Sequence, residues 1–123
     1  MAKPALITAR IMLAALFVLA GINKLTSISA TSEYIETASV LPGFLAAPTG
    51  VFELVSGILL ALGKFPRIVA PIMSGFTLLT IAFFHYDFSQ QIEVTLALKN
   101  LAIAGGLLMV FAYEEAARQS PSA

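Results

Sequence analysis

Glu53 is the residue whose position in this sequence most clearly suggests chemistry. It lies near the middle of residues 43–63, an apolar stretch long enough to cross a bilayer, which takes about 20 residues. A carboxylate at that depth costs several kcal/mol unless it is paired, protonated or turned toward a polar cavity. Other helices must therefore supply its environment, and such a site could exchange a proton or bind a polar ligand.

Lys99 is the partner that we expect for Glu53. Counted from the same membrane surface of an up-and-down bundle, Glu53 lies nine residues in from Phe44 and Lys99 seven in from Ile92. At a rise of about 1.5 Å per residue, their levels differ by roughly 3 Å, which is within side-chain reach.

Other polar groups surround this level, and we take them as candidate ligand-binding residues with Glu53 and Lys99. Asn100 adjoins Lys99, and three further side chains lie at helix ends on the same side: Asn23, Lys24 and His85. Arg10 lies deeper, toward the opposite surface, and we expect it to be a structural partner of Glu53 or of lipid headgroups.

The elements that must position these groups follow from composition. The chain has 123 residues, of which 59% are hydrophobic and 11% charged, and its mean hydropathy is +0.91. Soluble domains are about half apolar and about a quarter charged. Four apolar segments, each near the length of one span, occupy residues 5–25, 44–63, 67–86 and 92–113. The sequence therefore predicts one all-α domain over residues 1–123, an integral membrane four-helix bundle, because a soluble bundle would need polar outer faces.

The distribution of basic residues predicts that both termini are cytoplasmic. With the N-terminus inside, the opposite side holds Lys24 alone, whereas the cytoplasmic side holds Lys3, Lys64, Arg67 and Arg118. The first span is expected to be retained and not cleaved as a signal peptide, because further spans follow it. The longest loop, 26–42, is either a short interfacial helix or an ordered loop, and the polar tail 114–123 is expected to fray.

Small residues indicate which helix faces pack together. Two stripes at helical spacing carry Arg10, Ala14, Phe17, Gly21 and Lys24, and Ala46, Gly50, Glu53, Gly57 and Leu60. Ala102 and Gly106 share a face with Lys99. Because small residues let membrane helices approach closely, we expect all three faces to point into the bundle.

Several classes of function are excluded or disfavoured. Seven basic and seven acidic residues cancel, so no nucleic-acid partner is expected. The absence of cysteine rules out thiol relays and Cys-ligated metal centres within this sequence. We expect no metal site, since the single histidine, His85, is better explained as a hydrogen-bonded helix end near Asp87. Any redox chemistry would need a diffusible or partner-held cofactor.

The sequence also resembles a known family. The segments ARI (9–11), LFVLAGINKL (16–25), LPGF (41–44), FE (52–53), GFTLLTIAFFH (75–85) and KNLAIAGGLL (99–108) are similar to those of the DoxX family of small four-helix membrane proteins. This resemblance implies a bacterial inner-membrane protein, with family polar motif positions at Arg10, Lys24, Glu53, His85, Lys99 and Asn100. Some members are subunits of thiosulfate:quinone oxidoreductase, and others are linked to quinone or oxidative-stress handling.

These observations lead to three hypotheses of function. In the first, Glu53, Lys99 and Asn100 bind a quinone or similar carbonyl compound in a pocket with an apolar wall of Phe83, Phe84 and Phe88. The chain would then be the quinone-facing subunit of a redox system whose electron carrier sits on a soluble enzyme partner. The second is a small proton-coupled transporter, a homo-oligomer with Glu53 at a subunit contact. The third is a non-catalytic assembly subunit, in which Glu53 and Lys99 form a structural pair.

Overall fold

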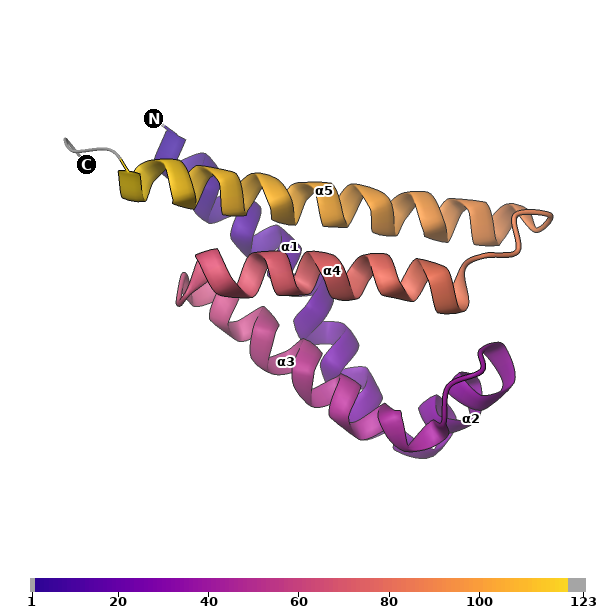
Figure 1. Ribbon diagram of the computed structural model, residues 1–123. Coiled ribbons are helices and arrows are strands. Elements are labelled where there is room, and N and C mark those ends of the chain that lie inside the picture. Colours follow the sequence, from indigo (N-terminus) through magenta and orange to yellow (C-terminus); the bar gives the residue numbers. More distant parts are fainter. Residues whose placement is uncertain (1, 120–123) are drawn as a thin grey trace.

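The computed structural model describes residues 2–119, which fold into four long helices and two short elements (Figure 1). The long helices are α1 (Ala2–Thr26), α3 (Ala46–Leu62), α4 (Pro66–Phe84) and α5 (Gln91–Gln119). The short helix α2 (Ile28–Ala38) and the 3₁₀ turn η1 (Gly43–Leu45) connect α1 to α3. Each long helix, α3 together with η1, is long and apolar enough to cross a membrane, which confirms that the chain has four long apolar helices.

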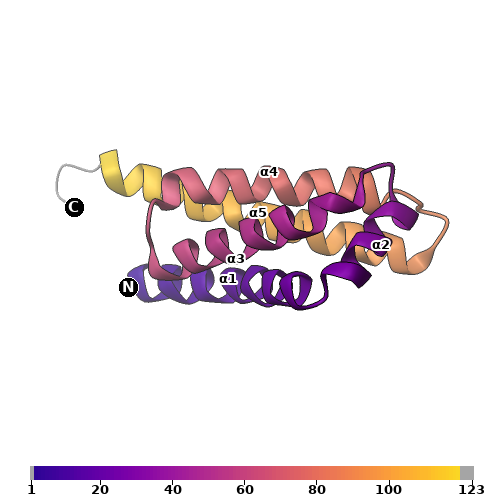
Figure 2. The ribbon, with the colours of Figure 1, turned by 90° about the horizontal axis from the view of Figure 1, so that it is seen from below.

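The long helices pack as two pairs. α1 packs chiefly against α3, and α4 chiefly against α5, whereas contacts between the pairs are sparse. Figure 1 shows the α1–α3 pair diverging from the α4–α5 pair toward α2. In the perpendicular view of Figure 2, the four long helices run along a common direction, with the start of α1 and the end of α5 toward the same end. The bundle is therefore a wedge that opens toward α2.

Glycines let α1 and α3 approach until their backbones touch. A Cβ atom built on Gly21 would lie 2.6 Å from the backbone nitrogen of Leu54 and 2.8 Å from the carbonyl oxygen of Gly50. On α3, Gly57 also lies against α1, with a Cβ position 2.9 Å from Val18 Cγ2 and 3.1 Å from the Val18 backbone nitrogen. The two predicted stripes of small residues on these helices are thus confirmed as packed faces.

The apolar core fills the narrow end of the wedge. Its buried members come from all four long helices: Ala14, Phe17, Leu60, Val69, Ala70, Met73, Leu107 and Val110. Leu60 and Val69 flank the tight α3–α4 turn, where Gly63 has a φ of 72° that ends α3 and Pro66 begins α4. Side chains close this end, so any internal space must lie toward α2.

Two predictions made for segments outside the apolar stretches can be compared with the structure: the long loop and the C-terminal tail. Residues 28–38 form a helix, which decides between the two alternatives for the long loop. The expectation of a frayed tail is wrong for residues 114–119, because α5 continues through Gln119. No glycine or proline interrupts this part of α5, and Glu115 accepts hydrogen bonds from Arg118 and Gln119 one turn away. The remaining tail residues, 120–123, lie outside the described part of the chain.

Candidate functional site

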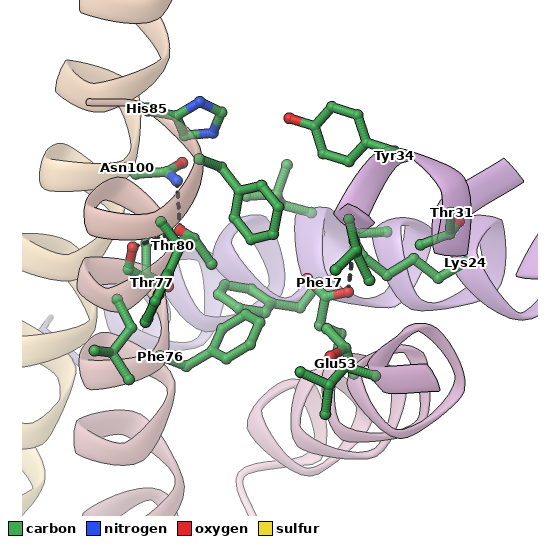
Figure 3. A pocket seen from close by; sticks show the side chains of 18 of the residues that line it. Phe17, Lys24, Thr31, Tyr34, Glu53, Phe76, Thr77, Thr80, His85 and Asn100 are labelled. Atoms are coloured by element: carbon green, nitrogen blue, oxygen red, sulfur yellow. Dashed lines mark hydrogen bonds and ion pairs between the residues drawn. The ribbon is translucent and has the colours of Figure 1, made fainter. Parts of the chain in front are cut away.

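A cavity of about 410 Å³ lies between the two helix pairs, at the open end of the wedge and beneath α2. Aromatic side chains make much of its wall: Phe17, Tyr34, Phe76, Phe83 and Phe84. Ionisable and amide groups also line it: Lys24, Glu53, His85, Lys99 and Asn100. Figure 3 shows several of these side chains converging from α1, α2, α3 and α4.

Glu53 forms an ion pair with Lys24, not with Lys99. Lys24 Nζ lies 2.8 Å from Glu53 Oε1, and the two side chains are 27% and 9% exposed. The pair (Figure 3) joins α1 to α3, the two helices in closest contact. A Cβ on Gly50 would lie 3.1 Å from Lys24 Cβ, so glycine there lets Lys24 lie along α3 and reach Glu53 one turn away.

Lys99 lies at the edge of the packed face of α5. Within residues 2–119 its ammonium group has no hydrogen bond and no ion pair within 4.0 Å, and the side chain is exposed. The buried face of α5 instead carries Ala97, Ala104, Leu107 and Val110. The expected inward face through Lys99, Ala102 and Gly106 is therefore correct only in part: Ala102 is exposed, whereas Lys99 lines the cavity and Gly106 faces Leu13 of α1.

Asn100 is turned toward α4. Its Nδ2 atom donates a hydrogen bond of 2.8 Å to Thr80 Oγ1, which lies on the cavity wall (Figure 3). Adjacent residues on a helix point about 100° apart, so Asn100 faces the bundle interior while Lys99 turns toward its edge. The α4–α5 contact also includes a hydrogen bond from Ser74 Oγ to the Ala104 carbonyl oxygen at 3.0 Å.

His85 and Tyr34 lie where α2 covers the cavity. His85 Nδ1 lies 3.1 Å from Glu93 Oε2, so the partner of His85 is Glu93 and not Asp87. The Tyr34 ring stacks on Phe84 with centroids 5.6 Å apart, which joins α2 to α4. Partial burial, with a smaller effect of the Glu93 carboxylate, raises the pKa of Tyr34 above its ordinary value and keeps the phenol neutral.

Three of the predicted residues lie away from the cavity. Asn23 is exposed on α1 and is not part of the lining, and Phe88 is 63% exposed in the α4–α5 loop. Arg10 lies at the narrow end, where its guanidinium packs so closely on Gly63 that a Cβ there would overlap Nη1. The C-terminal end of α3 carries partial negative charge, so Arg10 stabilises this helix end and not Glu53.

Several lining residues were missed from the sequence. Thr31 lines the cavity from α2, Thr49 from α3, and Thr77 and Thr80 from α4. Threonine hydroxyls commonly bond to their own helix backbone, as Thr77 does to the Met73 carbonyl oxygen at 2.8 Å. A threonine in a span is therefore a weak sequence signal. Within residues 2–119, no three His, Asp or Glu side chains cluster as a metal site would require.

Four membrane-length helices, an ion pair with a buried carboxylate, and a mostly apolar cavity with a few polar groups define a multi-pass membrane protein with an internal site. Comparison with protein families gives a match to the DoxX family over residues 5–86, so the chain belongs to that family. Lys99 and Asn100 lie beyond the matched residues. The chain is also 36% identical over 104 residues to "Inner membrane protein YqjF" of Escherichia coli (strain K12), covering 85% of this chain and 79% of that protein.

No solved structure matches the chain. The relationship to the Escherichia coli protein and the four membrane-length helices assign the chain to the inner membrane.

Proposed function

We propose that the cavity binds the ring of a quinone or a similar carbonyl compound. In this proposal the chain is the membrane-embedded, quinone-facing subunit of a redox or oxidative-stress system. The observation that carries the proposal is a buried carboxylate–ammonium pair, Glu53 with Lys24, facing a cavity with an aromatic wall. Ligand sites are typically about 300–1,000 Å³ and mostly apolar with a few convergent polar groups, and a cavity of about 410 Å³ fits that description.

The lining residues match the needs of such a ring. Phe17, Phe76 and Phe83 offer apolar and aromatic surface against which a flat ring can pack. Lys24 and Asn100 offer N–H donors to carbonyl oxygens, and Asn100 uses one of its two amide hydrogens on Thr80.

Proton exchange would be the task of Glu53. Reduction of a quinone to a quinol takes up two electrons and two protons, so the Glu53 carboxylate would take a proton from water twice and pass each one to a ring oxygen. The chain contains no cysteine to carry electrons, so the electrons would come from a redox enzyme bound at the membrane surface.

The two other hypotheses gain no support from the arrangement. The transporter hypothesis requires Glu53 at a contact between subunits, yet the residue is 7% exposed and its ion-pair partner belongs to the same chain. A purely structural pair would explain the contact between α1 and α3 but not the cavity that the pair faces. Quinone binding accounts for both features.

The test is mass spectrometry of the lipophilic molecules that co-purify with the detergent-solubilised protein. The wild type is compared with Glu53→Gln and with Glu115→Gln, which also removes an ion-paired carboxylate but at the far end of α5. We expect quinone with the wild type and with Glu115→Gln, and its loss from folded Glu53→Gln. Equal retention by both variants, or no quinone with the folded wild type, would contradict the proposal.

A further inference from the structure

A second hollow runs along the outside of the bundle, between α1 and α5. It is an open groove of about 770 Å³ whose α5 side carries Ile103, Gly106, Met109, Val110 and Tyr113. Its α1 side is formed by Ala5, Leu6, Ala9, Met12, Leu13 and Leu16, and Lys99 is its one charged lining residue within the described chain. The groove exists because α1 and α5 belong to different helix pairs and contact each other sparsely.

The groove and the internal cavity are adjacent. Leu16, Lys99 and Ile103 line both of them, so these three side chains form the boundary between the two spaces. On α5 the groove continues from Lys99 to Tyr113, about 21 Å at the rise of a helix. This is more than half of the roughly 30 Å thickness of the hydrocarbon core. A molecule that displaced the side chains of this boundary could therefore extend from the cavity into an apolar groove open to the bilayer.

We propose that the ligand is an amphiphile whose polar ring occupies the cavity and whose apolar tail lies in this groove. The inference rests on the proposed quinone-binding function and specifies the ligand class: a membrane-resident quinone with a long hydrocarbon tail. The tail passes between Leu16 and Ile103, and the ligand enters sideways from the bilayer.

The residues at this boundary suit such a ligand. Lys99 has no partner within residues 2–119, so its ammonium group is available to an oxygen on the ring where ring and tail join. Beyond it, the lining carries no further charge within the described chain. Because lipid chains are as apolar as the groove, tail binding depends on packing and shape and not on removal from water.

Two adjacent glycines provide a matched pair of variants. A Cβ on Gly106 would point into the groove and meet Leu13 Cδ2 at 3.4 Å, whereas a Cβ on Gly105 has no atom within 4 Å. Leucine at 106 would therefore occupy the groove, while leucine at 105 would face open space. The affinities of a decyl-substituted benzoquinone and of the same ring without the tail are measured for wild type, Gly106→Leu and Gly105→Leu.

We expect Gly106→Leu to bind the decyl compound about tenfold more weakly, as an overpacked contact would, and to bind the tail-less ring like the wild type. Gly105→Leu should bind both compounds like the wild type. Unchanged decyl affinity in Gly106→Leu would overturn the inference and leave the groove to bulk lipid. If the wild type binds neither compound, the proposed function fails and the inference fails with it.

A second measurement keeps the inference testable if Gly106→Leu does not fold. A decyl benzoquinone with a photoreactive diazirine at the end of its tail is cross-linked to the wild-type protein, and the labelled peptides are mapped. Labelling of the α1 and α5 residues that line the groove is expected. Labelling confined to α4, or to the far side of α3, would overturn the proposed path of the tail.

Discussion

Removing Lys24 should destabilise the protein far more than removing Lys99, although both are lysines in or near spans. The Glu53 side chain is 9% exposed and lies 2.8 Å from Lys24 Nζ. Lys24→Met would leave that carboxylate buried without its partner, which typically costs about 3–5 kcal/mol. Because the Lys24 side chain is 27% exposed, the expected loss of unfolding free energy lies at the lower end of that range, about 3 kcal/mol.

The same reasoning gives the expected stability changes of three related variants. Glu53→Gln leaves a partly exposed lysine that can turn toward the membrane surface, so its cost should be about 1 kcal/mol. Lys99 has no partner in residues 2–119, so Lys99→Met should change stability by less than about 0.5 kcal/mol. The double variant Lys24→Met/Glu53→Gln should be more stable than Lys24→Met alone, with a coupling energy of about 2 kcal/mol.

The assay is equilibrium unfolding in mixed micelles with a denaturing detergent, followed by far-ultraviolet circular dichroism. A cost for Lys99→Met equal to that of Lys24→Met would refute the assignment of the ion pair. Additive effects of Lys24→Met and Glu53→Gln would refute the coupling between the two side chains.

Three further predictions use the same unfolding assay. Gly21→Ala forces a Cβ against the α3 backbone and should lower the free energy of unfolding by about 1–3 kcal/mol. Gly105→Ala, in open space, should raise it by up to about 1 kcal/mol. Similar effects at both sites would contradict the close contact between α1 and α3. Ser74→Ala removes a buried hydrogen bond to an α5 carbonyl and should cost about 0.5–1.5 kcal/mol, so an unchanged midpoint would argue against that bond. The raised pKa of Tyr34 means that folding favours the neutral phenol, so the stability present below about pH 10 should fall as the pH rises through the raised pKa. Tyr34→Phe should reduce this alkaline loss of stability. The same alkaline loss in Tyr34→Phe as in the wild type would contradict the prediction.

The helices and the packed faces of α1 and α3 could be predicted from the sequence because they depend on local properties. Apolar length alone identifies the spans. Gly50 and Gly57 recur at helical spacing with Gly21 on the facing helix, and only small residues allow backbones to touch. The same local logic shows that Glu53 needs a partner.

The identity of that partner could not be predicted because it depends on which helices are neighbours. Depth matching placed Lys99 within roughly 3 Å of the level of Glu53, but depth does not distinguish a neighbouring helix from a distant one. α3 pairs with α1, so Lys24 reaches Glu53 from a shallower level by lying along the glycine face.

The side of α5 that packs against the other helices was predicted only in part, for a related reason. In a membrane helix, the side toward lipid and the side toward other helices are both apolar, so periodicity gives little signal. Ala102 resembled part of a packing stripe but is exposed, and the buried side of α5 is that of Ala104 and Leu107, with Gly106 beside it facing α1. The consequence is functional, because it places Lys99 at the boundary between the cavity and the groove.

The central claim is that the cavity beside the Lys24–Glu53 pair binds a quinone ring. Its most direct test is calorimetric titration of a tail-less benzoquinone into wild type and into the double variant Lys24→Met/Glu53→Gln, which removes both charges without leaving either unpaired. The account predicts saturable binding of one ring per wild-type chain and no measurable binding to the folded double variant. Equal binding by the two proteins, or no binding by the folded wild type, would contradict it.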